Sequence, residues 1–165
     1  ELRACKFVGE KGVNGLLSCE FSPDNVKGIS PYEIVYQLTD ESVDYKKLIE
    51  ELAKTGASDF DLDTSYLSKD SLDQFFKKYI AYPVELEVEC DVYVDGKGVY
   101  CLQHGDTNHM MVNYLELVDV KDDVITFVYV DNLYYGGFFP NLIISLQKNG
   151  ESFKFVSVSN KLYNK

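Results

Sequence analysis

The stretch from Val84 to Val94 alternates apolar and polar residues, and it constrains the fold more than any other feature of the chain. Its apolar positions are Val84, Leu86, Val88, Cys90, Val92 and Val94, and its polar positions are Glu85, Glu87, Glu89, Asp91 and Tyr93. A period of two residues is typical of a β-strand with one buried face and one face in water. The sequence therefore predicts a sheet that begins directly after Pro83.

Two short turn motifs predict how strands of this sheet pair. Asp95-Gly96 has the residues of a type I′ turn, which places Val94 opposite Lys97, Val92 opposite Val99 and Cys90 opposite Cys101. Asn149-Gly150 is a second turn of this kind. It pairs Lys148 with Glu151, Leu146 with Phe153, and Ile144 with Phe155.

Two further strands are expected between these hairpins. Residues 110–120 and 124–130 are both rich in apolar residues, and Lys121-Asp122-Asp123 joins them. The second stretch is apolar on both faces, which predicts a central strand or a strand covered by a helix. We expect about six strands over residues 84–158, paired in sequence order as an antiparallel meander.

Between Ser30 and Pro83 the apolar residues follow a helical period instead. Helices are expected over about 31–38, 42–55 and 68–80, and the third has the clearest apolar face and a capping Ser68. Residues 1–29 are punctuated by glycines and predict an irregular segment or a short hairpin that brings Cys5 near Cys19.

These patterns together predict one α+β domain over residues 1–165, with N-terminal helices packed on the meander. The chain length of 165 residues suits a single core, and an apolar content of 45% is too high for a disordered chain.

The charge of the chain limits its partners. Its 16 basic and 27 acidic residues give a formal net charge of −11. Such a field repels a phosphate backbone and an anionic membrane surface, so no nucleic-acid partner is expected. A cation, a basic partner or simple solubility remain as explanations. No apolar run reaches the roughly 20 residues that a membrane-spanning helix needs.

The cysteines leave two alternatives open. Cys5, Cys19, Cys90 and Cys101 are even in number and contain no CxxC spacing. This is compatible with two disulfides, for which Cys90 and Cys101 are the better-placed pair, or with four buried thiols.

An acidic segment between the second and third expected helices is a candidate calcium site. Asp59, Asp61, Asp63, Ser65 and Asp70 match five ligand positions of a calcium-binding loop. Thr64 occupies the position where such loops need glycine, and Asp70 replaces the usual glutamate. A solvated acidic loop is the alternative, and no other cofactor is expected.

A histidine-containing segment is a second candidate metal site. His104, Asp106 and His109 lie within six residues of one another, and imidazole and carboxylate groups bind zinc and related metals. Gly105 to Asn108 also has ordinary turn chemistry, so a loop is the alternative.

An aromatic segment is the candidate ligand-binding surface. Tyr134, Tyr135, Phe138 and Phe139 flank the pair Gly136-Gly137. Such rings could form a pocket wall for an apolar or sugar-like ligand, or they could cover the end of the core. No residue is assigned a catalytic role.

Two segments carry a resemblance to a known group of proteins. The run His104-Gly105-Asp106-Thr107-Asn108 and the hairpin Ile144 to Ser157 are similar to segments in small extracytoplasmic domains of Gram-positive bacterial lipoproteins. The order of helices and then a meander also resembles NTF2-like and cystatin-like folds. These resemblances imply a sheet that wraps around helices, with a pocket on its concave side.

The combined observations predict a non-enzymatic binding or accessory module of a bacterial lipoprotein or secreted protein. Such a module would be extracytoplasmic, either tethered to the cell surface or secreted, and would bind a small ligand or a protein. The start at Glu1, with no initiator Met, fits removal of a leader or a cut chain. One alternative is an acidic inhibitor or immunity-type protein that neutralises a basic partner through the polar stripe of residues 85–91. A metal-dependent hydrolase is the third alternative, if the histidine segment folds into a cleft.

Overall fold

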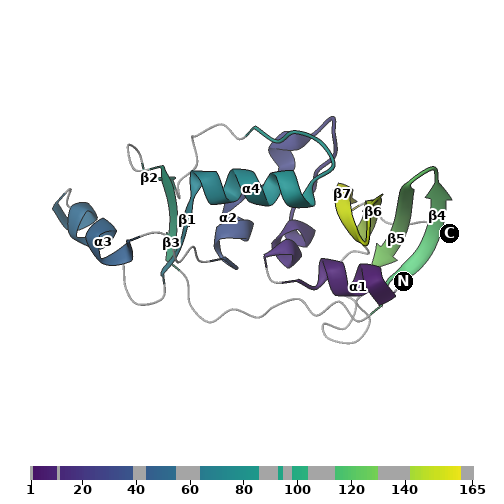
Figure 1. Cartoon of the computed structure of the whole chain (residues 1–165), viewed down its shortest axis with the longest axis horizontal. Coiled ribbons are helices and arrows are strands. Elements are labelled where there is room, and N and C mark those ends of the chain that lie inside the picture. The colour runs from purple at the N-terminus through teal and green to yellow at the C-terminus, as the bar shows by residue number, and fades with distance from the viewer. Residues whose placement is uncertain are drawn as a thin grey trace.

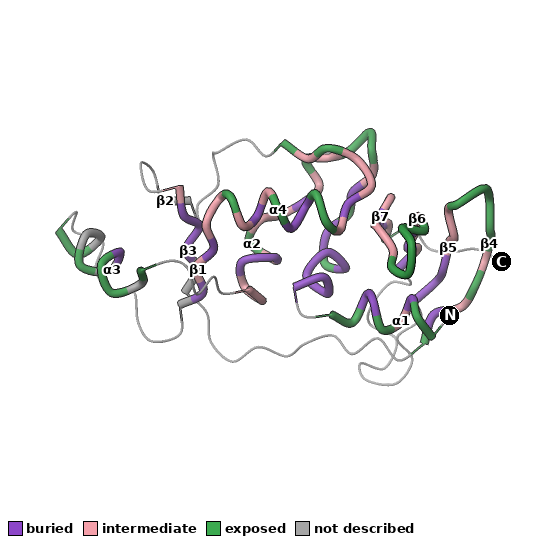
Figure 2. Tube along the Cα trace, viewed as in Figure 1, coloured by how far each residue is buried: buried purple, intermediate pink, exposed green. Residues whose placement is uncertain are grey.

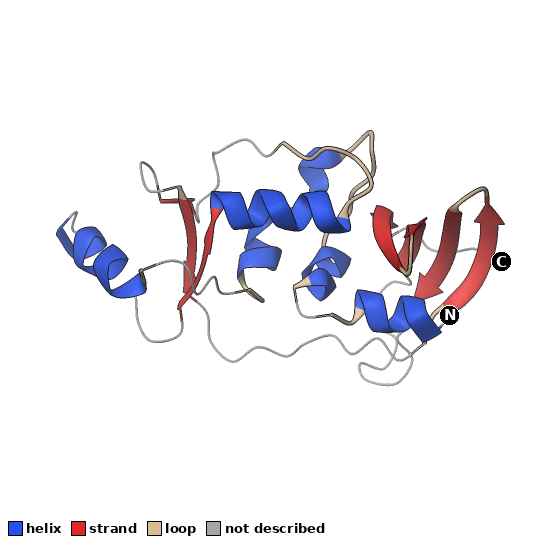
Figure 3. Ribbon diagram, viewed as in Figure 1, coloured by secondary structure: helices blue, strands red, loops and turns tan. Residues whose placement is uncertain are grey.

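The computed structural model describes residues 2–10, 12–38, 44–54, 64–85, 93–94, 98–103, 114–129 and 142–160. The helices, with η for short 3-10 helices, are α1 (Leu2–Val8), η1 (Val13–Ser18), η2 (Val26–Gly28), α2 (Pro31–Val35), α3 (Tyr45–Lys54) and α4 (Lys69–Tyr79). The strands are β1 (Thr64–Ser68), β2 (Tyr93–Val94), β3 (Val99–Gln103), β4 (Glu116–Lys121), β5 (Val124–Tyr129), β6 (Leu142–Asn149) and β7 (Ser152–Ser159). The expected α+β class is confirmed, and most of the helices lie between two groups of strands (Figure 3).

The strands divide between two antiparallel sheets and do not form one continuous meander. One sheet has three strands in the order β1-β3-β2, and the other has four in the order β4-β5-β6-β7. The two sheets lie at opposite ends of the helical layer, and α3 lies beyond the smaller one (Figure 1). Only the larger sheet keeps the expected order, in which neighbours along the chain pair as hairpins.

β1 is a strand that the sequence does not predict, because its pattern indicates a loop and the start of a helix over residues 64–68. It pairs antiparallel with β3, with Ser68 opposite Val99. The neighbouring hairpin also differs from expectation, because Val94 pairs with Val99 and not with Lys97. The Lys69 amide donates to the carbonyl oxygen of Gly98 at 2.8 Å, which connects the start of α4 to the residue before β3.

The larger sheet confirms the central position expected for residues 124–130, since β5 pairs with β4 on one side and with β6 on the other. The hairpin between β4 and β5 turns at Asp122 and Asp123, and Asp122 has a φ of 55°. Aspartate tolerates this left-handed backbone better than most residues, which explains its place in so tight a turn.

The last hairpin also differs in register from expectation. Asn149 pairs with Ser152, and Leu146 pairs with Phe155 and not with Phe153. The turn therefore consists of Gly150 and Glu151, and Gly150 supplies the positive φ of 61°. Between the turn and Leu146, the shift of two residues leaves each side chain on its expected face, because the period of a strand is two.

Helix α4 follows the sequence prediction closely. The Ser71 amide donates to the hydroxyl oxygen of Ser68 at 3.1 Å, which is the expected N-terminal cap. Its buried residues are Leu72, Phe75 and Phe76. The helices expected over 31–38 and 42–55 are present as the shorter α2 and α3.

The N-terminal region corrects the expectation of an irregular segment or hairpin. Residues 2–8 form α1, and two 3-10 helices follow within residues 13–28. Phe7 of α1 packs its ring against Phe153 and Phe155 of β7, at centroid distances of 5.7 and 5.4 Å. The segment is thus helical because its apolar side chains cover one face of the larger sheet.

A single large core cluster joins the two ends of the molecule. It extends from Leu67 and Tyr100 of the smaller sheet to Ile144 and Phe155 of the larger one (Figure 2). A smaller cluster of Leu48, Val99 and Cys101 lies between α3 and β3. None of the helices in the described ranges has the length and apolar character that crossing a bilayer requires.

Candidate functional site

The described cysteines are free thiols. Cys5 lies in α1 and Cys19 directly follows η1, so the hairpin that was expected to bring them together is absent. Cys101 is also free and lies in β3, while Cys90 falls outside the described residues. With Val94 opposite Val99, the register that set Cys90 opposite Cys101 is wrong.

The two buried thiols are poorly suited to nucleophilic chemistry. Burial raises the pKa of Cys19 to about 11, and burial also raises the pKa of Cys101 to about 11. Only the thiolate is a strong nucleophile or metal ligand, so both side chains are held in the unreactive form near neutral pH. Cys19 instead accepts a hydrogen bond from the Ser30 amide at 3.4 Å.

The candidate calcium residues fall into different elements where the structure describes them. Ser65 is buried in β1, and Asp70 is exposed in the first turn of α4. Asp59, Asp61 and Asp63 fall outside the described residues, so the proposed site stays a prediction. Within the ranges that the structure covers, no three histidine, cysteine, aspartate or glutamate side chains gather as a metal site would require.

The other two candidate segments also fall outside the described residues. They are the histidine segment with His104, Asp106 and His109, and the aromatic segment with Tyr134, Tyr135, Phe138 and Phe139. Of the polar stripe that was expected to meet a basic partner, Glu85 is described, and it is exposed after the end of α4. The roles expected for these three segments therefore stay predictions.

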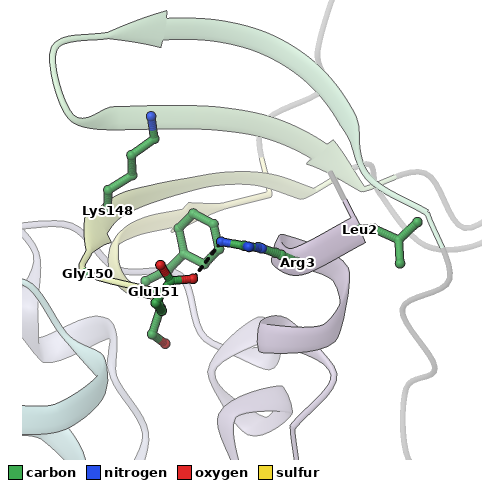
Figure 4. Close-up of a pocket in the computed structure, with 7 residues that line it drawn as sticks. Leu2, Arg3, Lys148, Gly150 and Glu151 are labelled. Atoms are coloured by element: carbon green, nitrogen blue, oxygen red, sulfur yellow. Dashed lines mark hydrogen bonds and ion pairs between the residues drawn. The ribbon is translucent and has the colours of Figure 1, made fainter.

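A pocket of about 340 Å³ lies between the start of α1 and the β6–β7 turn. Its lining consists of Leu2 and Arg3 from α1, Lys148 from β6, Gly150 and Glu151 from the turn, and Ser152 and Phe153 from β7. Two of these lining residues, Arg3 and Glu151, form an ion pair at 2.8 Å (Figure 4). Both side chains of this pair are largely exposed, so water screens their charges and the pocket offers little electrostatic binding energy.

The outer edge of the larger sheet is the more distinctive surface. β4 is its terminal strand, and it carries Leu117 and Val120 with 45% and 53% of their surface exposed. Leu117 pairs with Phe127, and Val120 pairs with Ile125. Directly paired residues project from the same face, so both exposed side chains continue the apolar face that forms the core.

The exposure is specific to the last strand of this sheet. α1 packs on β7, and β5, β6 and β7 each contain buried side chains, whereas the described residues of β4 contain none (Figure 2). Phe127 of β5 is still buried, whereas Leu117 beside it on β4 is not. Among the described residues, nothing pairs with the outer side of β4.

The backbone of β4 also faces outwards at this edge. Lys121 and Val124 flank the two-residue turn and form the hydrogen-bonded pair, so the next pair, Val120 with Ile125, is the non-hydrogen-bonded kind. The amide of Val120 therefore points away from β5. It donates to the Oδ1 atom of its neighbour Asp119 at 2.9 Å, which agrees with that geometry.

The polar groups around this edge are mainly acidic. Asp119, Asp122 and Asp123 are all exposed, and Lys121 is the base among them. We define the β4 edge as Leu117, Asp119, Val120, Asp122 and Asp123. It combines an apolar strip, an outward backbone donor and a group of carboxylates.

The sequence correctly predicts a strand and a turn at the residues of the β4 edge, but it does not predict that this strand ends the sheet. The apolar residues at positions 117 and 120 are expected in the core, because a sequence does not reveal which strand lies at the edge of the sheet. The described residues define an α+β protein in which nothing pairs with the outer side of β4, a terminal strand of the larger sheet. Comparisons of the chain with protein families, with curated proteins and with solved structures found no match.

Proposed function

We propose that the protein is a non-enzymatic binding module that binds an extended segment of a partner protein along β4. The observation that carries this proposal is the pairing of exposed apolar side chains with an outward backbone amide on a terminal strand. An added strand gains main-chain hydrogen bonds from such an edge and gains apolar burial from its alternate side chains.

The proposal also explains why an apolar strip lies at the margin of the sheet. Natural sheet edges are usually protected by charges, proline or covering segments, because an open edge promotes unwanted pairing. Leu117 and Val120 leave the core-facing side of β4 uncovered among the described residues. Covering each by a partner would remove about half of a valine- or leucine-sized surface from water, which contributes about 1 kcal/mol per residue.

A selection with random peptides tests the proposal without a known partner. Peptides of about nine residues would be selected against the full chain and then compared on the variant Val120→Pro. Proline removes the outward amide, and edge strands tolerate proline where the N–H faces away from the sheet. We expect the selected peptides to lose about 10-fold or more in affinity for this variant.

Two controls separate the edge from other surfaces. Leu2→Ala removes a side chain that is 89% exposed and lines the pocket beside α1, so it should leave peptide affinity unchanged. Circular dichroism and a thermal melt would establish that Val120→Pro is folded. If Leu2→Ala abolishes binding while Val120→Pro does not, the pocket is the binding site and the proposed edge is wrong.

We also propose that the module acts outside the cytoplasm. This rests on the resemblance of the segments 104–108 and 144–157 to extracytoplasmic domains of bacterial lipoproteins. Fractionation of the native cells, with an antibody raised against the chain, tests this location. Recovery of the protein with the cytoplasmic fraction alone would contradict it.

A further inference from the structure

We infer that the segment bound along β4 is basic, with lysine or arginine alternating with apolar residues. The inference rests on the proposed function and adds the chemical class of the partner. It is carried by Asp119, whose carboxylate occupies the position that the partner's backbone must take.

The side chain of Asp119 currently protects the edge. Its Oδ1 atom accepts the Val120 amide at 2.9 Å, and both residues are exposed. A strand that adds to β4 must bring a carbonyl oxygen to this amide and must therefore displace the carboxylate. Protection of an edge by a charged side chain is a common device, and here the protecting group can rotate away.

A basic side chain on the incoming strand compensates for this displacement. Asp119 and Val120 are neighbours in a strand, so their side chains project from opposite faces. A partner with apolar residues on the Val120 face carries its alternate residues on the Asp119 face. Lysine or arginine at those positions would pair with the displaced carboxylate, and the partner's carbonyl would accept the Val120 amide. The number of hydrogen bonds at the edge is then preserved, and a charge pair is added.

The remaining charges near the edge balance one another, so the preference for a basic partner comes from Asp119 and from the charge of the whole chain. Asp122 and Asp123 are exposed in the turn at the end of β4, and Lys121, which is also exposed, lies on the strand itself. Lys148 of β6 also lies beside the turn, since its amide donates to the carbonyl oxygen of Asp123 at 2.9 Å. The net charge of the whole chain is −11, so the long-range field attracts a cationic segment and repels an acidic one.

A second copy of the chain fits this edge less well. Pairing β4 with itself would bring two sets of the same exposed aspartates together, in addition to the repulsion between two chains of charge −11. Like charges that face one another across an interface are destabilising. We therefore expect the protein to use this edge for a different, basic chain.

Three synthetic peptides of equal length test the inference by fluorescence anisotropy with the full chain. They alternate valine with lysine, with serine or with glutamate. The lysine peptide should bind about 10-fold more tightly than the serine peptide, and the glutamate peptide should bind most weakly. Raising the salt from about 20 mM to about 300 mM should remove most of this preference, because exposed charges are screened.

Matched variants assign the preference to individual residues. Asp119→Asn keeps an oxygen for the Val120 amide but loses the charge, so it should lower the lysine-over-serine preference about threefold or more. Asp24→Asn removes an exposed aspartate between η1 and η2, away from β4, and should leave the preference unchanged. Val120→Pro should lower the affinity for the lysine peptide about 10-fold.

Each other outcome would overturn the inference. Equal binding of the three peptides, with loss in Val120→Pro, would show an edge that accepts any strand and would leave the proposed function standing. Binding of the lysine peptide that is insensitive to Val120→Pro would show diffuse attraction to the acidic surface. Binding of no peptide, or a dimer in sedimentation equilibrium that Val120→Pro dissociates, would also contradict a basic partner. The random-peptide selection would still decide whether the edge binds a partner at all.

Discussion

Replacing Phe155 with alanine tests how the N-terminal helices hold the larger sheet. Phe155 of β7 is 0% exposed, and its ring packs against Phe7 and Phe21 at centroid distances of 5.4 and 6.2 Å. Removing a buried phenylalanine side chain costs about 3–5 kcal/mol. Each aromatic pair contributes about 0.5–1.5 kcal/mol beyond its buried area, so we expect the cost to lie near the upper end of that range.

The measurement is urea unfolding of wild type and variant, followed by circular dichroism at equilibrium. The urea concentration at the midpoint of unfolding should fall strongly. The dependence of the free energy of unfolding on urea concentration should stay unchanged, since the surface exposed on unfolding is nearly the same. Phe153→Ala is the matched control, because Phe153 lies two residues earlier on β7 and also contacts Phe7, but it is only half-buried. We expect Phe153→Ala to lower the free energy of unfolding by about 2 kcal/mol. If Phe155→Ala loses no more stability than Phe153→Ala, the packing of α1 and Phe21 on β7 is not what stabilises the sheet.

Four smaller perturbations probe separate features. Ser68→Ala removes the cap of α4 and should lower the free energy of unfolding by about 1 kcal/mol, measured in urea. Iodoacetamide at pH 8 should label Cys19 more than about 10-fold more slowly than the half-buried Cys5, because the pKa of Cys19 is raised to about 11; equal rates by mass spectrometry would contradict its burial. Burial raises the pKa of Glu33, so the folded state holds this proton more tightly and loses stability as the pH rises through that pKa. Glu33→Gln should therefore raise the melting temperature at pH 7, and the gain should vanish below about pH 4. Gly28→Ala would place a Cβ 1.7 Å from the carbonyl oxygen of Glu20, and it should cost about 2–4 kcal/mol in urea unfolding.

The parts of the fold that the sequence predicted are those that local interactions determine. Helix α4 has its cap at Ser68 and its apolar residues at helical spacing, so the same signals that predict it also stabilise it. The hairpin from β4 to β5 was likewise predicted, because its turn residues and its apolar strands lie within residues 116–129. In both cases the relevant contacts join residues that are close along the chain.

β1 was missed because its stabilisation is non-local. It has five residues, Thr64–Ser68, and it follows a run of aspartates that favours a loop. Its partner β3 lies more than thirty residues further along the chain, as in the pair of Ser68 with Val99. The residues next to β1 in the sequence do not indicate a pairing with a strand so far along the chain.

The register of the last hairpin shows how packing overrides turn preference. Asn149-Gly150 is a favourable turn by itself, yet the structure turns at Gly150 and Glu151. A bulge on β7 lies between Leu146 paired with Phe155 and Ser145 paired with Ser157. The extra residue reverses the facing of the strand, so Phe155 and Val158 are both fully buried although three positions separate them.

The two edges of the larger sheet explain why a binding role is attached to β4 and not to β7. At the β7 edge, the amides of Phe21 and Val158 each donate to the other's carbonyl at 3.0 Å, and the Ala81 amide donates to the carbonyl of Phe155 at 2.9 Å. These are main-chain contacts fixed by the packed helices, so an incoming strand would have to unfold part of the core to replace them. At the β4 edge, the outward amide of Val120 is protected by the side chain of Asp119. A carboxylate can move away from the amide by rotating about its own side-chain bonds, without disturbing the fold. A cation on the incoming strand would then form an ion pair with the displaced carboxylate. The difference between a sealed edge and a displaceable cap is therefore what makes β4 suited to binding a basic strand.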